Sequence, residues 1–250
     1  MKKLLSIAVA SVAVAALADP FSPTIGVTQI TTSLKNTVIP VQFSSLTNGN
    51  VTADSLVCTN GLPNGTCLYI FDGTSQSYSA WVLGNTGWVG ATRAGVDGID
   101  AAAAAEGQVL AVGSALWISL PEAAETTFSL YGKVATATNT TIIGGTKAAP
   151  KYNLVANPTG ADIEYSVLID KLSALNPQSG DTASPLIGRF KGNFVYDGTQ
   201  WKFITTNPAN GSMVIMTMED FFGAFGDDEK FPAHAGFWYV SKGGAGQISW

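Results

Sequence analysis

Short segments of alternating apolar and polar residues recur along the chain, which is typical of half-buried β-strands. Residues 126–131 alternate in this way, and residues 201–204 place two aromatic side chains on one face. Two aromatic segments, 68–71 and 193–196, each run into an Asp-Gly pair. Such a pair between apolar runs is the strongest short-range signal of a hairpin, because both positions tolerate a positive φ. The pattern therefore predicts a mainly β protein built from antiparallel, β-sandwich-like units.

Three segments interrupt this pattern and favour short helices. After Asp162, an apolar stripe follows the helical spacing, at Ile163, Val167, Leu168, Leu172 and Leu175. Residues 217–220, Thr-Met-Glu-Asp, have the form of a capping box ahead of three phenylalanines. In the first half of the chain, Asp100 followed by five alanines and Glu106 is the counterpart of this second helix. We expect these helices to close the ends of the sandwich-like units.

The chain repeats itself, since three anchors recur in the same order. They are an apolar stretch, an aromatic strand ending in Asp-Gly, and a glycine followed by an aromatic strand: 37–43 and 152–158, 68–74 and 193–199, 113–119 and 236–241. We predict a tandem duplication of two β-rich repeats, residues 19–131 and 132–250, joined at the glycine-rich segment 144–150.

The second repeat resembles a known but uncharacterised family. The run NLVANPTGADI at 153–163, the YDG turn at 196–198 and the strand AGFWYVS at 235–241 are similar to NLxGNP-type and GxxFW-type motifs. These motifs occur in a paralogous family of secreted β-proteins of verrucomicrobia-like bacteria. The chain departs from the family in Ala156, where glycine is usual, and the first repeat lacks the Asn-Pro pair. The resemblance implies an extracellular β-fold and brings no catalytic residues.

The first 18 residues have the form of a signal peptide. Lys2 and Lys3 precede an apolar run over residues 4–15, and Ala16-Leu17-Ala18 supplies small residues for cleavage. The alternative is a membrane anchor, but the run is short for a span and a polar stretch follows it. No later stretch has the length of a transmembrane segment. We expect export, with the mature protein outside the cell or at its surface.

The composition excludes several classes of function. Only 12% of the 250 residues are charged, and the isoelectric point near 4.7 provides no basic face for nucleic acid. One histidine and two cysteines are too few for a zinc finger or an iron–sulfur cluster. In an oxidising compartment, we predict that Cys58 and Cys67 form a disulfide across the turn-rich loop between them.

Catalytic chemistry is sparse in this sequence, and we predict that the protein is not an enzyme. His234 is the single histidine, and no partner residues mark it as a general base. The acidic run Asp227-Asp228-Glu229 is a candidate calcium site, although a solvated loop is the simpler interpretation. Apart from this weak calcium assignment, no cofactor is expected.

Aromatic residues just beyond the Asp-Gly turns form a candidate ligand platform: Tyr78, Trp81, Trp88 and Trp201. Exposed aromatic rings bind sugar rings or other proteins. The alternative, that most of these rings belong to the core, is the one we favour.

Two functions remain. In the first, the protein is a non-catalytic structural component that self-associates in an extracellular layer, filament or matrix, because strands with few charges are prone to edge pairing. In this hypothesis the strand-like segment after the cleavage site pairs either within its own sheet or with a neighbouring molecule. In the second, the protein is a carbohydrate-binding or adhesive module, with a polysaccharide as partner.

Overall fold

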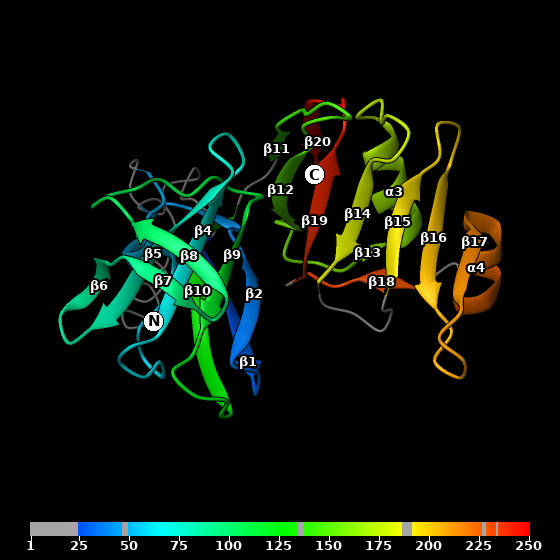
Figure 1. Cartoon of the computed structure of the whole chain (residues 1–250). Coiled ribbons are helices and arrows are strands. Elements are labelled where there is room, and N and C mark those ends of the chain that lie inside the picture. Colours follow the sequence, from blue (N-terminus) through cyan, green and yellow to red (C-terminus); the bar gives the residue numbers. More distant parts are fainter. Residues whose placement is uncertain (1–24, 47–49, 135–137, 187–191, 227–228, 234) are drawn as a thin grey trace, which may run out of the picture.

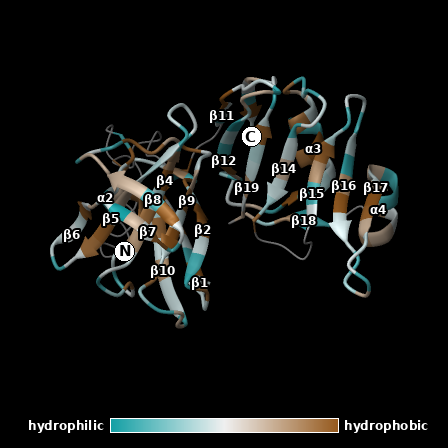
Figure 2. Cartoon of the chain, in the orientation of Figure 1, coloured by the Kyte–Doolittle hydropathy of each residue, from teal (hydrophilic) through white to brown (hydrophobic). Residues whose placement is uncertain are grey.

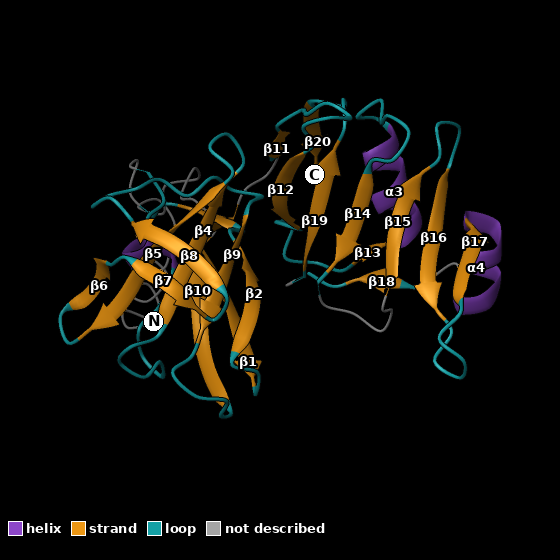
Figure 3. Ribbon diagram, in the orientation of Figure 1, coloured by secondary structure: helices purple, strands orange, loops and turns teal. Residues whose placement is uncertain are grey.

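The computed structural model describes residues 25–46, 50–134, 138–186, 192–226, 229–233 and 235–250. Figure 1 shows two bodies side by side, which we call the N-terminal lobe (25–134) and the C-terminal lobe (138–250). Every sheet draws its strands from one lobe only. Strands predominate over helices (Figure 3), and all but one of the strand pairs are antiparallel. The predicted mainly β fold is confirmed.

The N-terminal lobe is a sandwich of two sheets. Three strands form one sheet in the order β1-β10-β3, and the other has the order β2-β9-β4-β5-β8-β7, with β6 also paired to β5. The elements of this lobe are β1 (Ile25–Thr32), β2 (Asn36–Pro40), β3 (Phe43–Ser44), α2 (Ala53–Leu56), β4 (Cys67–Asp72), β5 (Ser77–Gly84), β6 (Gly87–Gly90), β7 (Arg93–Val96), β8 (Ile99–Ala103), β9 (Ala115–Ser119) and β10 (Thr126–Val134).

The C-terminal lobe has one six-stranded sheet, in the order β12-β19-β14-β15-β16-β17, and two small sheets, β11-β20 and β13-β18. Its elements are β11 (Asn139–Ile142), β12 (Lys151–Ala156), β13 (Ile163–Glu164), α3 (Tyr165–Ser173), β14 (Thr182–Pro185), β15 (Gly192–Tyr196), β16 (Trp201–Thr206), β17 (Met213–Thr217), α4 (Met218–Phe225), β18 (Lys230–Phe231), β19 (Gly236–Ser241) and β20 (Gly246–Ser249).

The two main sheets bury their inner faces differently. In the N-terminal lobe, Leu68 and Ile118 of the main sheet pack with Phe128 and Leu130 of β10 in one core cluster. In the C-terminal lobe, Phe194 and Phe203 pack against Tyr165 of α3 and Phe221 of α4. Figure 3 shows both helices on the same side of the sheet. One core is therefore sheet on sheet, and the other is largely helix on sheet.

A hairpin of β7 and β8 lies against the outer face of the N-terminal main sheet. Ala101 and Ile99 of β8 pack with Cys67 and Tyr69 of β4. Asp97, at the tip of the hairpin, accepts a hydrogen bond from Ser119 Oγ at 2.5 Å and pairs with Lys35 Nζ at 2.6 Å. Burial raises the pKa of Asp97, but the Lys35 and Ser119 hydrogen bonds together outweigh it, so its pKa lies below the usual value.

Two of the three predicted helices are confirmed. Helix α3 buries Leu168 and Leu172 of the expected stripe, but Val167 is 40% exposed, Ile163 lies in β13 and Leu175 follows the helix. Its N-cap position is Glu164, and Asp162 instead accepts a hydrogen bond from Ala233 N at 2.9 Å. Helix α4 begins at the predicted box, in which Thr217 and Asp220 cap each other.

The third predicted helix, at Asp100 and the alanines that follow it, is wrong. Asp100 and the first three alanines belong to β8, which ends at Ala103 and pairs in parallel with β5, and the residues that follow are not helical. Alanine side chains are small enough for β8 to lie close to its neighbours, and this tertiary contact overrides the helical propensity of alanine.

The main sheets of the two lobes share part of their strand order. In each sheet, a strand from late in the lobe lies between two strands from earlier in the lobe. The N-terminal lobe has the order β2-β9-β4, and the C-terminal lobe has the order β12-β19-β14. Val38 lies opposite Trp117 in one lobe, and Leu154 lies opposite Trp238 in the other. The first and third anchors therefore occupy corresponding strands.

The second anchor does not correspond. Asp72 ends β4 at the turn into β5, and β4 lies next to β9. Asp197 follows β15 at the turn into β16, and β15 is separated from β19 by β14. Both Asp-Gly pairs do lie in turns between paired strands, as predicted. The tandem duplication itself stays a prediction.

The signal peptide predicted at residues 1–18 lies outside the described residues. In the part of the chain that the structure describes, none of the helices has the length and apolar character needed to cross a membrane.

Candidate functional site

The lobes meet through the outer faces of their main sheets. Val38 and Ala115 of the N-terminal lobe form a buried cluster with Leu154 and Ala156 of the C-terminal lobe, and Phe71, Trp117, Leu186 and Trp238 pack around it. Because Val38 and Leu154 lie opposite Trp117 and Trp238 in their own sheets, each lobe contributes an aliphatic and tryptophan pair to the contact. The joint is therefore apolar and close-packed.

Main-chain contacts fix the lobes to each other. Ser114 and Val155 form an isolated β-bridge, and Ala156 N donates to Gly113 O at 3.0 Å. Gly236 allows this close approach, since a Cβ there would lie 2.6 Å from Val38 Cγ1 and 3.0 Å from Val155 O.

Gln76 closes the outer edge of β12. Its side-chain Nε2 donates to Tyr152 O at 3.0 Å, and its Oε1 accepts from Tyr152 N at 2.8 Å. A side-chain amide thus replaces the main chain of a neighbouring strand. Lys151 Nζ also donates to Thr74 O, in the same turn, at 3.3 Å.

An aromatic groove of about 620 Å³ opens beside this joint. Its rings come from both lobes, with Phe71 and Tyr78 on one side and Tyr152 and Trp238 on the other. The Phe71 and Trp238 ring centroids are 4.9 Å apart at 85°, and those of Tyr152 and Trp238 are 6.2 Å apart at 86°. Phe71 and Tyr78 extend the series at 5.1 Å. Such edge-to-face contacts are favourable and hold each ring in a fixed orientation.

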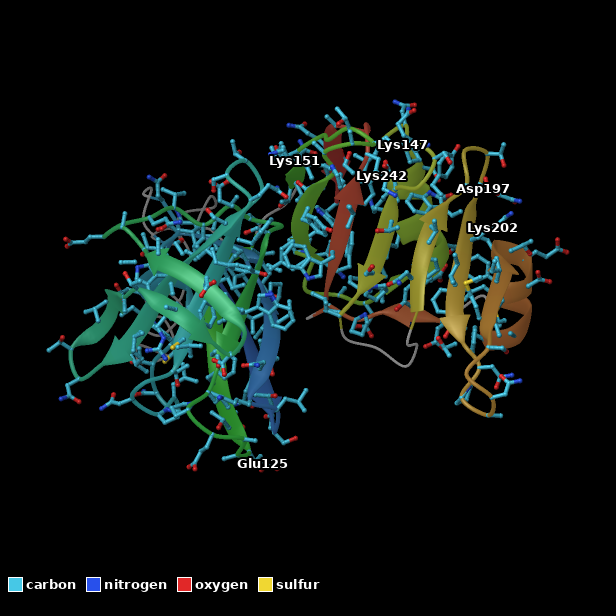
Figure 4. All side chains as sticks on the ribbon, in the orientation of Figure 1. Glu125, Lys147, Lys151, Asp197, Lys202 and Lys242 are labelled. Carbon is cyan, nitrogen blue, oxygen red and sulfur yellow. The ribbon has the colours of Figure 1, made fainter. Side chains whose placement is uncertain are left out.

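The groove is electrically neutral. None of its described lining residues has an ionised side chain, and the remaining positions are Gln76, Pro150, Ser184 and Val240. Burial raises the pKa of the Tyr78 hydroxyl, so this group stays neutral at physiological pH. Lys151 lies between the lining residues Pro150 and Tyr152 in the chain, but its Nζ donates to Thr74 O. Figure 4 places Asp197 beside Lys202 at the β15–β16 turn, away from the groove, where the two form an ion pair at 2.8 Å. The groove is suited to binding rather than to proton transfer.

Of the four residues predicted as a platform, only Tyr78 belongs to this groove. Trp81, Trp88 and Trp201 are only 4%, 7% and 2% exposed and lie in the lobe cores. Trp81 and Trp88 border a second hollow with Asp54 and Glu106, but their rings have no open face for a ligand. For these three residues the interpretation favoured from the sequence holds, because each ring lies on the inner face of its sheet and belongs to the core.

The residues that sequence reasoning missed are Phe71, Tyr152 and Trp238. Phe71 and Trp238 lie within the aromatic segments of the predicted repeat, which the sequence marks only as strands. Their partial exposure depends on the packing of one lobe against the other, and no local pattern carries that information.

The predicted disulfide is also wrong, since Cys58 and Cys67 are free thiols. Cys58 N donates to Ser129 O of β10, in the smaller sheet of the N-terminal lobe. Cys67 begins β4 in the main sheet and packs with Tyr69 and Ala101 on its outer face. The two cysteines lie on different layers of the sandwich, so the loop between them does not bring them together. Burial raises the pKa of the Cys67 thiol.

The candidate calcium site falls largely outside the described residues, which omit Asp227, Asp228 and His234. Glu229 is described, and its main-chain oxygen accepts from Tyr165 N at 3.1 Å. Within the described ranges, His, Cys, Asp and Glu side chains do not gather in threes as a metal site requires.

A second candidate site is formed by sheet edges. Among the described strands, four of the six ends of the three larger sheets are protected in ways known to prevent edge pairing. β3 is only two residues long, β2 ends at Pro40, β7 carries Arg93 at an irregular register, and Gln76 closes β12. The other two ends, β1 and β17, are uncharged along their whole length.

These two free edges carry exposed apolar side chains. Val27 of β1 is 67% exposed and Ile215 of β17 is 53% exposed, and Ile25 and Met213 accompany them. β1 pairs with β10 along all eight residues, so it completes its own sheet and leaves its other edge free. β17 lies at the far end of the C-terminal sheet (Figures 1 and 2).

Comparison of the chain with protein-family models, with curated proteins and with solved structures finds no match.

Proposed function

We propose that this is a non-catalytic, exported structural protein that self-associates outside the cell. The observation that carries the proposal is the pair of uncharged, apolar free edges, one on each lobe, in a molecule whose other large-sheet ends are protected. Unpaired N–H and C=O groups along such an edge are a template for another strand. Export rests on the sequence of the first 18 residues.

Pairing of β17 of one molecule with β1 of the next joins two different surfaces. Such a heterologous contact does not close on itself unless the rotation between molecules forms a ring, so it generates a filament. The contact extends the C-terminal sheet of one molecule into the small sheet of the next and covers Ile215 and Val27. Growth by addition of strands is a known mode of recognition between β-proteins.

The test uses the chain without its first 18 residues, measured by light scattering and electron microscopy. Wild type is expected to form elongated particles. Ile215→Lys and Val27→Lys each place a charge on one edge and are expected to stop growth. A mixture of the two variants retains one intact edge on each partner, so it is expected to form a dimer and nothing larger.

Val167→Lys is the control, because Val167 is also an exposed valine, on α3 and away from both edges, and its substitution is expected to leave assembly unchanged. A wild-type protein that stays monomeric at high concentration, with or without calcium, contradicts the proposal. So does assembly that survives both edge substitutions.

A further inference from the structure

We propose that the aromatic groove between the lobes binds an uncharged carbohydrate. This inference does not depend on self-association, because the groove and the free edges of β1 and β17 share no residue. The groove is lined by four aromatic rings, by three hydroxyls and by the side-chain amide of Gln76, which is held in place.

The size and composition of the groove fit a small ring-shaped ligand. Its volume of about 620 Å³ falls within the usual range for ligand sites, about 300–1,000 Å³. Such sites combine mostly apolar walls with a few polar groups that fix orientation. Here the walls are Phe71, Tyr78, Tyr152 and Trp238, and Ser184 lies opposite Trp238 in the sheet.

The openness of the groove to water favours a sugar over a wholly apolar ligand. An aromatic ring has a negative face, which attracts the positively polarised C–H groups on one side of a sugar ring. The hydroxyl groups around the sugar's rim stay in water or bond to the groove. An apolar ligand would leave its outer side exposed to solvent. Tyr152, which is 47% exposed, offers the most open ring.

The absence of charge in the lining selects the class of carbohydrate. A uronate or a sulfated sugar buried here would lose hydration without an ionic partner among the described lining residues. The lining supplies the hydroxyls of Ser184 and Tyr152 as polar groups that can bond to sugar hydroxyls. The ligand is therefore neutral.

The groove is also organised before a ligand arrives. The side-chain amide of Gln76 holds the main chain of Tyr152 through both its nitrogen and its oxygen. The rings from Tyr152 to Tyr78 are packed edge to face. A site whose side chains are already ordered spends less conformational entropy on binding.

The experiment is native gel electrophoresis through gels that contain hydroxyethyl cellulose, glucomannan, xylan or dextran, with alginate as the charged comparison. The protein carries Ile215→Lys, so that self-association does not alter its mobility. At least one neutral polysaccharide is expected to retard it, and alginate is not. Tyr152→Ala is expected to weaken the retardation about tenfold, since it removes one ring contact, and Tyr152→Phe keeps the ring and most of the binding.

Tyr131→Ala is the matched control, because Tyr131 is a partly exposed tyrosine on β10 that bonds to Asp54 O, outside the groove. It is expected to bind like the parent protein, and circular dichroism checks that each variant is folded. The proposal is overturned if no neutral polysaccharide retards the protein, if alginate retards it equally, or if Tyr152→Ala binds as well as Tyr131→Ala. None of these results bears on the edge-pairing test, which uses different residues and a different readout.

Discussion

The two lobes leave their main sheets with different outer faces. In the N-terminal lobe, the β7–β8 hairpin packs onto the outer face of β4 and is anchored by Asp97. In the C-terminal lobe, the described residues place no such hairpin over β15 to β17, and Ile215 and Met213 are exposed. Sheets with partly similar strand order thus differ in what they offer to other molecules. The outer face at β17 is therefore exposed, whereas the outer face at β4 is covered.

The inner faces differ as well. The N-terminal sheet packs on a second sheet, whereas the C-terminal sheet packs on α3 and α4 with a cluster of aromatic rings. A β-sheet with one apolar face can pack either on a second sheet or on helices, because both present an apolar surface to it. Four predictions test the packing of each lobe and the joint between them, beginning with the largest expected effect.

Phe221→Ala is expected to destabilise the protein by about 3–5 kcal/mol, the usual cost of deleting a buried phenylalanine. Phe221 is fully buried and its ring contacts Tyr165, Phe194 and Phe203. Urea denaturation followed by tryptophan fluorescence measures the loss. Phe222→Ala is the control, because the neighbouring ring is only partly buried, and an equal loss in both variants would contradict the packing described.

Gly236→Val is expected to cost about 1–3 kcal/mol by overpacking the joint between the lobes. The added side chain collides with Val38 of the other lobe. If the lobes unfold as one unit in wild type, two separate transitions are expected in the variant by calorimetry. Gly223→Val, where nothing lies within 4 Å of a Cβ, is expected to be nearly neutral. A single unchanged transition for Gly236→Val would show that the joint contributes little.

Asp97→Ala is expected to cost about 1–2 kcal/mol, a value reduced from that of a buried charged pair because Lys35 is nearly half exposed. The hairpin tip is released, and faster hydrogen exchange in β4 and β5 reports the uncovered face. The pKa of Asp97 is lowered, so its contribution is complete above the ordinary aspartate pKa and is lost as pH falls through the lowered value. The variant and wild type therefore converge in acid.

Asp100→Ala is the comparison for this variant, because Asp100 accepts only from Gly95 N within the same hairpin. Its effect on exchange in β4 is expected to be smaller. Equal exchange in the two variants would mean that Asp97 does not anchor the hairpin.

Reducing agent is expected to leave the melting temperature unchanged, because Cys58 and Cys67 are not bonded. Cys58 is expected to react with an alkylating reagent faster than Cys67, which is buried and whose pKa is raised. Mass spectrometry of the native protein over time gives both rates. A mass two hydrogens below that of the reduced protein would restore the disulfide.

Local patterns predicted what local interactions decide. The capping box of α4, the buried Leu168 and Leu172 of α3 and the Asp-Gly turns depend on neighbours within a few residues, and all are present. The opposition of Val38 and Trp117 in the sheet matches that of Leu154 and Trp238 because aromatic strands pair with apolar ones on one face.

What failed depends on contacts between distant parts of the chain. The alanine run has a high helical propensity and still forms β8, because β5 offers it a partner. Trp81 and Trp88 differ from Trp238 only in the face of the sheet that they occupy and in what covers it. The groove likewise exists only once the lobes have met, so no segment of sequence contains it.

The amide of Gln76 has a consequence for the order in which the lobes fold. All strands of the N-terminal lobe precede β12 in the chain, and the lobe ends at residue 134. Because domains generally fold as units from the N-terminus, the turn that carries Gln76 is ready when β12 forms. The edge of β12 that faces away from β19 then gains its side-chain partner as soon as the C-terminal sheet is assembled.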